Sequence, residues 1–591
     1  MGSDREPVAA AGINKSHGAS LCLVDGGGQP LFCASEERFT RVKLQRGMPH
    51  HTYEHVAREY DVDAAKLAIA RLGTTRRILR EAESYRRAIR GGLFAIPPVE
   101  RLAEVAGIAY RKKIRRDREL HRMSIDTSYF MGRGVDRGFD HHLCHMASAY
   151  YCSGLDDAVV VSVDGVGDLL SAVVGRGRGT ELRVTGRCFQ SEQISGQAYE
   201  VVTAMLGFHP DRHPGKVTGL AAYAEVDPEL VGELDAWFGG QYRRGAKDNW
   251  FHLIHTADEQ AQLQRLRALR ETRFGRWSKE EISAAIQFVL ERDVLALVRR
   301  HVPDAAGRDI VLAGGVFANV KLNQRVKELG FRQIFVQPAM GDEGTGFGAA
   351  ILAAHEIAPF HPYRLRDVYL GPEFSDREIA QALQASGLAF SELPGGRLEQ
   401  ELAQLLFRGF IVARFQGRME FGPRALGNRS ILYHTQDPAA NDWLNRQLKR
   451  SEFMPFAPVT LAERAGECYR NVGGAEHAAE FMTMTFDVTP AMQRQSPACV
   501  HVDGTARPQL VRPQSNPSLY RTLEAYHRLS GIPSLINTSF NMHEEPIICT
   551  PQEAITAFRT ANLDALAIGD CLVVNESPQA PHRSGSAAAS A

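Results

Sequence analysis

The chain has 591 residues, carries 69 Lys and Arg against 69 Asp and Glu, and is 44% apolar. This length predicts about three to four units of about 150 residues, each able to bury an apolar core. The balanced charge argues against a nucleic-acid coat protein and against a binder of anionic membranes, because both usually show a basic excess. A local cationic pocket for a small anion stays compatible with it.

No targeting or membrane segment is predicted. The N-terminus lacks a charged region followed by an apolar one, and the chain has no apolar run of about 18 residues. The nine cysteines form no C-x-x-C pair, and most lie in apolar stretches. This usage predicts buried, reduced thiols in a cytoplasmic protein. Residues 576–591, rich in Pro, Ser and Ala, are expected to form a disordered tail.

The first predicted elements are strands at 8–15, 20–25 and 30–35, the last two joined by a glycine turn. Residues 74–122 are different, because Arg and Lys are frequent there and apolar residues recur at helical spacing. The favoured interpretation of 74–122 is a helical insertion with a solvated basic face, and a nucleic-acid site is the alternative.

Strands that end in glycine-rich turns follow. The buried run DAVVVSVDGVGD ends in a turn between two aspartates, and RDIVLAGGVFANVKLNQRV predicts strand, Gly-Gly turn and helix. FVQPAMGDEGTGFGAAILAAHE predicts a loop, a glycine-rich turn and a helix. This region can consist of two lobes with one architecture, since a strand pair and a glycine-rich acidic turn occur twice along it.

A second domain is predicted after a Pro-containing connector at 361–376. Helices are expected at 376–388 and 398–408, followed by the strand GFIVARFQG and by a stretch dense in motifs. The last expected strand is ALAIGDCLVV. The boundary is placed near residues 360–370.

The pair His141 and His145 is a candidate metal site, because residues four apart on a helix share one face. His142 and His145, three apart, are an alternative pair. Asp164 and Asp342 are the candidate carboxylates, and the other interpretation is that they cap turns. Two imidazoles with carboxylates suit a divalent transition metal, and iron or zinc would both fit.

Two further groups of residues indicate anion binding. Gly314, Gly315 and Asn319 follow a strand and open a helix, where backbone N–H groups can approach a phosphate or nucleotide. Neither a P-loop nor a GxGxxG motif is present. The second domain gathers cationic and amide-bearing residues beside Gly and Pro, which indicates a phosphate and carbamoyl pocket or, alternatively, internal salt bridges. These residues are Arg418, Arg424, Arg429, Lys449, Arg450, Arg507, Asn537, Thr538 and Ser539.

His17 lies between a glycine turn and an apolar strand, and Lys43 follows EERFTR. A lone histidine is usually structural, but at a strand turn in this lobe a general base is an equal alternative.

Taken together, the motifs resemble a known family. HHLCHMASAYY, VSVDGVGD, GKVTGLAAYA, VLAGGVFANVKLN, MGDEGTGFGAA, GRMEFGPRALGNRSIL, RSEFMPFAPV, HVDGTARPQ and INTSFNMHEEPI occur in one order. Over about residues 8–575 the chain resembles the O-carbamoyltransferases of the nodulation-factor and antibiotic-tailoring family, which include a tobramycin carbamoyltransferase.

The resemblance implies an α/β fold, with a two-lobed actin/Hsp70-like (ASKHA) domain at 1–365 and a YrdC-like domain at 366–575. In the C-terminal domain, carbamoyl phosphate and ATP would give carbamoyl-adenylate and pyrophosphate. In the N-terminal domain, a hydroxyl of a small natural product would take the carbamoyl group beside a divalent metal, Fe(II) in the first place. The expected protein has no nucleic-acid or membrane partner, and a homodimer is compatible with the family.

The family's site residues carry over by motif. His141, His145, Asp164 and Asp342 match its metal ligands, and Gly314, Gly315 and Asn319 match its nucleotide loop. Arg418, Arg424, Lys449, Arg507, Asn537 and Ser539 would bind carbamoyl phosphate and ATP, and His17 and Lys43 match catalytic positions near the acceptor. One departure matters: the family commonly reads HDAS where this chain reads HGAS at 17–20, so a carboxylate is missing at that turn.

Two rival functions stay open. The basic segment at 74–122 favours an ATP-dependent carbamoyltransferase that modifies tRNA, whereas the neutral overall charge disfavours it. A non-enzymatic regulator that binds metal and nucleotide is the other rival, but it has no use for the Arg cluster of the second domain. The sequence does not identify the hydroxyl acceptor.

Overall fold

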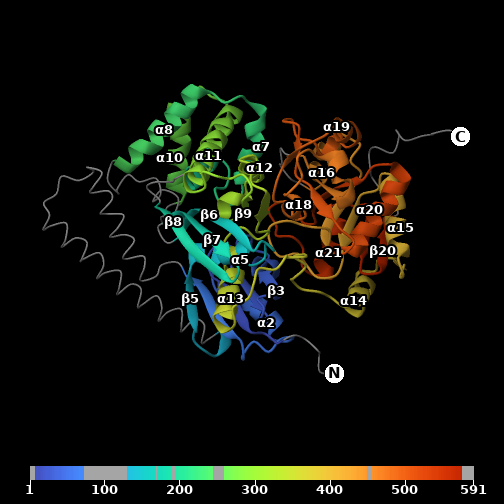
Figure 1. The fold of residues 1–591 in the computed structure, drawn as a ribbon. Coiled ribbons are helices and arrows are strands. Elements are labelled where there is room, and N and C mark those ends of the chain that lie inside the picture. The colour runs from blue at the N-terminus through green and yellow to red at the C-terminus, as the bar shows by residue number, and fades with distance from the viewer. Residues whose placement is uncertain are drawn as a thin grey trace, which may run out of the picture. The chain divides into compact units, whose positions relative to one another are not determined.

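The computed structural model describes residues 7–71, 130–167, 170–189, 195–243, 259–448 and 455–575 (Figure 1). The expected insertion at 74–122, the tail at 576–591 and the site residue Lys449 lie outside these residues. The chain divides into two compact units, of which the first comprises 1–31, 46–332 and 340–363 and the second 32–45, 333–339 and 364–591. The last segment of the first unit thus ends at Tyr363, within the predicted connector.

Two five-stranded sheets carry the N-terminal half of the chain. Their strand orders are β3-β2-β1-β4-β5 and β10-β9-β6-β7-β8. The strands are β1 (Ala10–Asn14), β2 (Ser20–Val24), β3 (Pro30–Ser35), β4 (Lys66–Arg71), β5 (Arg137–Asp140), β6 (Asp157–Gly167), β7 (Leu170–Arg178), β8 (Glu181–Phe189), β9 (Asp309–Ala313) and β10 (Gln333–Val336).

The two sheets repeat one topology. In each, the first strand in sequence pairs antiparallel with the second and parallel with the fourth, as β1 does with β2 and β4 and as β6 does with β7 and β9. Every residue of β1 and of β9 is buried, because helices and strands cover both faces. The resemblance between the two lobes therefore extends to strand order and direction.

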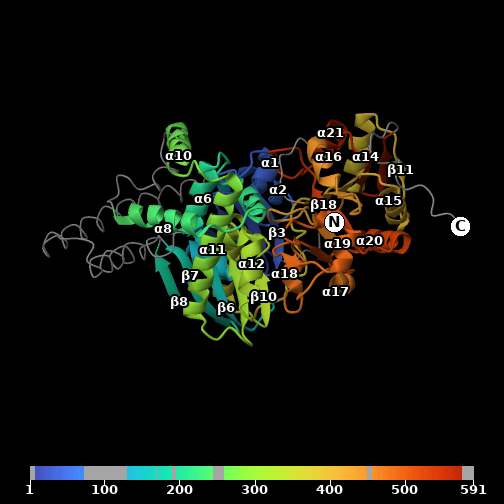
Figure 2. The same cartoon turned by 90° about the horizontal axis from the view of Figure 1, so that it is seen from above.

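Helices complete the first unit. They are α2 (His50–Val56), α5 (His141–Tyr150), α6 (Ser195–Met205), α7 (Pro214–Leu220), α8 (Pro228–Arg243), α10 (Glu259–Arg273), α11 (Lys279–His301), α12 (Val320–Lys327) and α13 (Glu343–Ile357). The long helix α11 begins at a capping box formed by Ser278 and Glu281, and it packs against α6, α7, α8 and α12 (Figure 2).

Glycines allow α13 to pack closely against β1 and α5. A Cβ at Gly348 would stand 1.9 Å from the carbonyl oxygen of Cys144 on α5, and a Cβ at Gly346 would stand 3.1 Å from the backbone nitrogen of Asn14 on β1. Gly346 and Gly348 are therefore packing residues of a buried helix.

An eight-stranded mixed sheet forms the second unit, in the order β11-β20-β19-β12-β13-β18-β14-β17. Its strands are β11 (Ser391–Glu392), β12 (Val412–Phe415), β13 (Arg429–Tyr433), β14 (Ala457–Leu461), β17 (Gln509–Val511), β18 (Ser534–Ser539), β19 (Ala565–Ile568) and β20 (Cys571–Val574). The helices are α1 (Glu37–Thr40), α14 (Asp376–Ser386), α15 (Arg397–Phe407), α16 (Ala440–Gln447), α17 (Ala465–Cys468), α18 (Glu476–Ala479), α19 (Pro490–Gln495), α20 (Pro517–Ser530) and α21 (Pro551–Thr560). A leucine-rich core lies between α15, α20 and the sheet.

Two segments, 32–45 and 333–339, depart from the expected domain layout. Residues 32–45 belong to the second unit, because two arginines of α1 and its C-cap bond to backbone carbonyls there. Arg38 donates to the carbonyl of Gly422 at 2.8 Å, and Arg41 donates to those of Ile547 and Pro546 at 2.7 and 2.6 Å. Local sequence patterning carries no signal for such long-range contacts.

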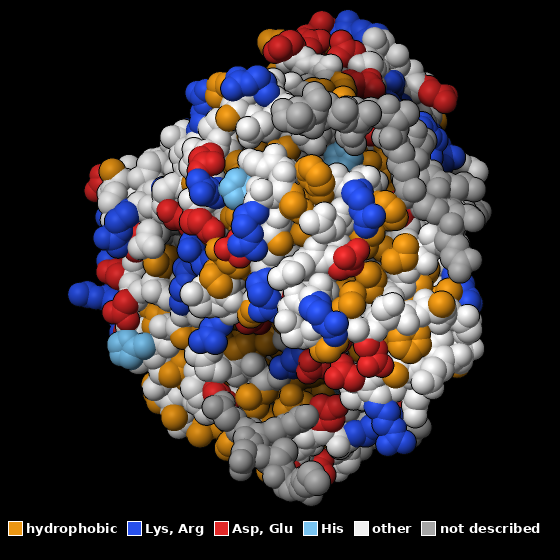
Figure 3. All heavy atoms as spheres, turned by 90° about the vertical axis from the view of Figure 1, so that its right-hand side faces the viewer, with side chains coloured by type: hydrophobic (Ala, Val, Ile, Leu, Met, Phe, Trp, Pro, Cys, Tyr) orange, Lys and Arg blue, Asp and Glu red, His pale blue; other side chains and the backbone are white. Residues whose placement is uncertain are grey.

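The distribution of surface charge and the burial of the cysteines agree with what the composition predicts. On the face shown in Figure 3, Lys and Arg side chains lie among Asp and Glu rather than in a single basic field. All nine cysteines are buried and free, which confirms the prediction of buried thiols. None of the helices in the described part of the chain has the length and apolar composition needed to cross a bilayer.

Candidate functional site

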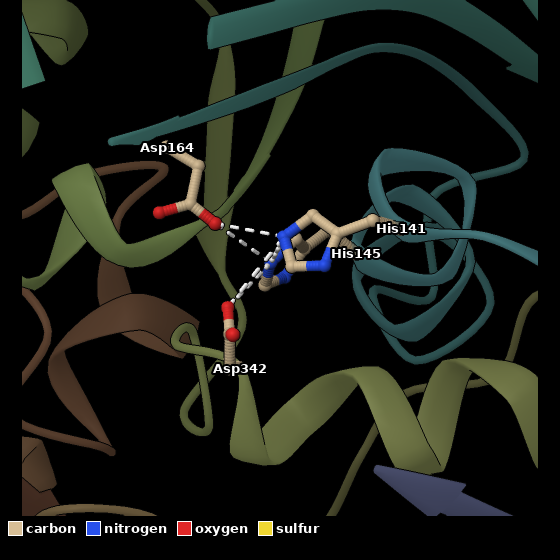
Figure 4. A group of neighbouring side chains, drawn as sticks. All are labelled: His141, His145, Asp164 and Asp342. Atoms are coloured by element: carbon tan, nitrogen blue, oxygen red, sulfur yellow. Dashed lines mark hydrogen bonds and ion pairs between the residues drawn. The ribbon is translucent and has the colours of Figure 1, made fainter. Parts of the chain in front are cut away.

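Four side chains from three parts of the first unit converge on one point (Figure 4). His141 and His145 come from the first and second turns of α5, Asp164 from β6, and Asp342 from the residue before α13. One ligand atom from each lies within 4.8 Å of every other. The structure thus brings together the four predicted metal ligands.

The contacts within this cluster are short. The Nε2 atom of His141 lies 2.9 Å from Asp164 Oδ2 and 3.5 Å from Asp342 Oδ1. For His145 Nε2 the same two distances are 3.3 and 3.7 Å, and the two Nε2 atoms are 3.1 Å apart. The imidazole side chains are at most 3% exposed, whereas the two carboxylate side chains are 15 and 17% exposed. The cluster is therefore accessible from its carboxylate side.

Burial and charge pull the ionisation of this cluster in opposite directions. Burial by itself raises the pKa of the Asp164 carboxyl, but hydrogen bonds from His141 and His145 hold it well below its ordinary value. Burial also opposes ionisation of Asp342, yet the neighbouring imidazoles lower its pKa. Burial lowers the pKa of His145, and its bonds to the two carboxylates more than offset this and raise it. The site thus favours anionic carboxylates.

The donor set suits a divalent transition metal. Ligands about 2.1 Å from a common ion stand about 3.0 to 3.4 Å apart at octahedral or tetrahedral angles, and the imidazole contacts measure 2.9 to 3.7 Å. Two imidazole nitrogens facing each other across 3.1 Å can share only one proton, so a cation satisfies both lone pairs at once. Two His and two carboxylates are compatible with iron or zinc.

Neighbouring groups hold the ligands in place. The hydroxyl of Ser16 lies 2.5 Å from Asp342 Oδ2, and the backbone N–H of Gly165 donates to Asp164 Oδ1 at 2.8 Å. Such outer contacts orient metal-binding carboxylates.

His142 has a structural role instead. Its Nδ1 lies 2.8 Å from the hydroxyl of Ser162 and its Nε2 lies 3.1 Å from the carbonyl of Leu170, away from the cluster. Burial lowers its pKa to about 3, so it is neutral. Of the two histidine pairs that the sequence left open, the structure assembles His141 with His145.

The predicted nucleotide loop has clear structural roles. Gly314 has a φ of 101°, and a Cβ there would stand 2.1 Å from the carbonyl of Val163; a Cβ at Gly315 would stand 3.0 Å from Asp164 Oδ1. These glycines let the end of β9 pass close to the strand that carries Asp164. Asn319 caps α12 and donates to Gln287 at 2.8 Å. Nucleotide binding by this loop stays a prediction.

His17 and Lys43 belong to different units. The imidazole of His17 lies 2.6 Å from Arg46 Nη2 and 3.5 Å from Asp211 Oδ2. Lys43 follows the segment that Arg38 and Arg41 attach to the second unit.

In the second unit, sheet topology brings the predicted anion-binding residues to one edge. Strand β12 ends beside the start of β13, which pairs with the end of β18. The end of β18 pairs with the start of β14, and β14 runs parallel to β17. Arg418 and Arg424 precede β13, Arg507 precedes β17, and Asn537 and Ser539 end β18. These five residues therefore share an edge of the sheet.

Side-chain contacts distinguish the members of this edge. Arg418 donates to the carbonyls of Leu370 and Gly371, and Arg429 is fully buried, bonds to backbone carbonyls and stacks over Phe415. Arg424, Arg507 and Ser539 are half-buried.

Asn537 is 2% exposed and donates to Gln509 at 2.7 Å. Its Oδ1 accepts no hydrogen bond from any described residue. A buried acceptor thus stands at the same edge as Arg424.

Sequence reasoning missed several residues at these sites. Ser16, Glu200 and Asp211 lie at or near the cluster of candidate metal ligands. In the second unit, Glu420 accepts backbone N–H bonds from Leu426, Asn428 and Arg429. Burial raises the pKa of Glu200 well above its ordinary value, and the carboxylates of three aspartates, Asp211 among them, add to this. None of these four residues lies at a recognisable sequence spacing from the residues that it contacts or influences.

Comparison with known proteins gives the family. Residues 103–351 match the model described as Carbamoyltransferase N-terminus, and residues 403–575 match that of the Carbamoyltransferase C-terminus. The chain is 33% identical to nodulation protein NolNO of Sinorhizobium fredii over 73% of this chain and 63% of that protein. It is 34% identical to nodulation protein NolO of Bradyrhizobium diazoefficiens, over 73% and 78%. An uncharacterized protein of Methanocaldococcus jannaschii is 33% identical, over 74% and 73%.

Among solved structures, full-length HypF aligns with 60% of this chain and 47% of its own at 14% identity, with a TM-score of 0.29. This TM-score is too low to assign a fold. The assignment therefore rests on the two family models and on relatives that are a third identical over nearly three quarters of the chain. On these grounds the chain belongs to the carbamoyltransferase family and is a transferase.

Proposed function

We propose that this enzyme transfers a carbamoyl group from carbamoyl phosphate to a hydroxyl of a small natural product, with ATP as co-substrate. The observation that carries the proposal is the convergence of two imidazoles and two carboxylates in the first unit of a carbamoyltransferase. In this scheme the second unit hydrolyses carbamoyl phosphate to carbamate and phosphate. The carbamate oxygen then attacks the α-phosphate of ATP, so that carbamoyl-adenylate forms and pyrophosphate leaves, and the first unit transfers the carbamoyl group. The proposal includes a duplicated actin/Hsp70-like first unit, supported by the repeated strand order, and a YrdC-like second unit.

The edge of the sheet in the second unit supports the activation step. Making carbamoyl-adenylate requires cations around the phosphate groups that leave and are attacked. Arg424 and Arg507 stand at the shared edge with Asn537, whose buried Oδ1 can accept a hydrogen bond from a carbamoyl NH₂ group. A neutral carbamoyl end and an anionic phosphate end would thus each meet a suitable group.

The metal cluster supports the transfer step. His141, His145, Asp164 and Asp342 would hold a divalent metal, Fe(II) in the first place, which as a Lewis acid polarises and orients an anionic substrate. His17 lies three residues after Asn14, the last residue of β1, and next to Ser16, which contacts Asp342. We propose that His17 accepts the proton of the acceptor hydroxyl.

The test separates the two half-reactions in the full-length protein loaded with Fe(II). Pyrophosphate release from ATP and carbamoyl phosphate reports activation, and carbamoylation of a panel of decarbamoylated natural products, read by mass, reports transfer. Asp164→Ala is expected to abolish transfer and retain pyrophosphate release, whereas Arg424→Ala is expected to lose pyrophosphate release. Arg408→Ala, at an exposed residue of the second unit, is the control. Absence of carbamoyl-phosphate-dependent pyrophosphate release in the wild type would refute the proposal.

A further inference from the structure

His17 has a charged environment supplied by residues distant in sequence. Arg46 Nη2 lies 2.6 Å from its Nε2 and 3.1 Å from its Nδ1, and Asp211 Oδ2 lies 3.5 Å from its Nδ1. Asp211 lies 194 positions after His17 in the sequence. His17 and Asp211 are 33 and 23% exposed, so both are accessible to a substrate.

The arginine favours one tautomer of the imidazole. A guanidinium keeps its protons and can only donate, so Nε2 of His17, at 2.6 Å against 3.1 Å for Nδ1, is the better placed acceptor. The proton of the neutral ring is then on Nδ1, which faces Asp211 at 3.5 Å. A carboxylate on Nδ1–H and a lone pair on Nε2 is the arrangement in which a histidine works as a general base. Such contacts are often longer before substrate binds.

The backbone on each side is held in place. Asn14 is 2% exposed, and its side chain donates to the carbonyls of His17 and Gly18 and accepts from the N–H of Ser16. On the other side, the N–H of Asp211 donates to the Nδ1 of His209 at 3.2 Å. Both loops are therefore fixed independently of the contact between His17 and Asp211.

The turn that carries His17 supplies no carboxylate of its own, because position 18 is Gly in this chain. Gly18 has a φ of +61°, in the left-handed region, and a Cβ there would stand 3.3 Å from the Cβ of Glu343. A side chain at position 18 would be strained and would face α13. A carboxylate for His17 has to come from another part of the fold.

Asp211 also lies on the side of the metal cluster. Burial raises the pKa of the Glu200 carboxyl, and the charges of Asp211, Asp164 and Asp342 raise it further. One carboxyl group is thus within electrostatic reach of both Asp211 and the two carboxylate ligands. His17, Asp211 and the cluster therefore border one region of the first unit.

We propose that Asp211 is a positioning residue that orients His17 for proton transfer from the acceptor hydroxyl, an inference that rests on the proposed function. In the transfer, the acceptor oxygen bonds to the carbamoyl carbon, the bond from that carbon to the adenylate oxygen breaks, and AMP leaves. The acceptor proton moves to Nε2 of His17. Arg46, which is 58% exposed, leaves Nε2 when the acceptor binds.

The experiment compares two small acceptors at molar concentration with the full-length, Fe(II)-loaded protein, ATP and carbamoyl phosphate. Methanol has to lose a proton to a base to give methyl carbamate, whereas hydroxylamine is nucleophilic without one and gives hydroxyurea. Asp211→Ala is expected to lower kcat for methyl carbamate by about tenfold to a hundredfold. Hydroxyurea and pyrophosphate are expected to stay within about twofold of wild type. Asp211→Glu is expected to recover part of the loss.

A double-mutant comparison excludes a merely structural role. If Asp211 acts through His17, then Asp211→Ala costs nothing further in a His17→Ala protein, since the group it orients is gone. The control is Asp304→Ala, at an aspartate of the first unit that is 83% exposed. Equal loss of both products, additive losses in the double variant, or a wild type that makes hydroxyurea and no methyl carbamate would each overturn the inference. A wild type that releases no pyrophosphate would instead overturn the proposed function, and the inference with it.

Discussion

The contact between Ser16 and Asp342 gives a quantitative prediction for metal binding. Ser16→Ala removes a hydroxyl 2.5 Å from the carboxylate oxygen of Asp342 that does not face the histidines. A hydrogen bond to a charged group contributes about 1.5 to 3 kcal/mol. Losing an outer contact of a metal ligand typically costs about 10- to 100-fold in affinity, or about 1.4 to 2.7 kcal/mol. The two estimates overlap, so the expected loss of metal affinity is about 10- to 100-fold.

Chelator competition with Fe(II) under anaerobic conditions measures this affinity, and urea unfolding of the metal-free protein measures any loss of stability. Ser153→Ala is the matched control, because the Ser153 hydroxyl donates at 2.7 Å to the carbonyl of Tyr150 and touches none of the four ligands. The control is expected to bind metal as the wild type does. Wild-type affinity in Ser16→Ala, or an equal loss in Ser153→Ala, would show that the hydroxyl does not orient the ligand.

Three further predictions concern pH and stability. Hydrogen bonds to the two carboxylates raise the pKa of His145, so protons compete with metal for this imidazole below its pKa. Metal affinity should therefore fall as the pH falls, by at most about tenfold per pH unit for this proton. A metal affinity that does not change with pH in chelator competition would contradict this prediction. Glu420→Ala leaves three buried N–H groups of the loop at 426–429 without their acceptor, and urea unfolding should show a loss of about 2 to 4 kcal/mol. Gly314→Ala places a methyl group 2.1 Å from a carbonyl of β6 and should lower Tm clearly more than Gly307→Ala, where φ is also positive but the space is open.

The convergence of the four candidate metal ligands was predictable because these residues carry local signals. His141 and His145 have helical spacing, and Asp164 and Asp342 stand where apolar runs meet glycine turns. Spacing did not decide between His141 and His142, since both can share a helix face with His145. The decision comes from packing: Ser162 and Leu170 take both ring nitrogens of His142, and only His141 stays directed at the carboxylates.

Arginine roles were less predictable. Residue type and flanking glycines grouped Arg418, Arg424 and Arg429 as one cationic cluster. In the fold, Arg418 and Arg429 donate to backbone carbonyls, which is a structural use of the same guanidinium chemistry. Which arginine faces a ligand depends on strand pairing tens of residues away, and no local pattern encodes that.

Charge balance over the whole chain hides the electrostatics of the two sites. In the first unit, burial raises the pKa of Glu200, and the charges of Asp211, Asp164 and Asp342 raise it further. These carboxylates concentrate negative charge that a divalent cation would offset. In the second unit, Arg424 and Arg507 lie at the same edge of the sheet as the buried amide of Asn537, an arrangement that suits an anion. A chain with no net charge is therefore compatible with one site for a cation and another for a phosphate, because the fold gathers carboxylates at one place and arginines at another.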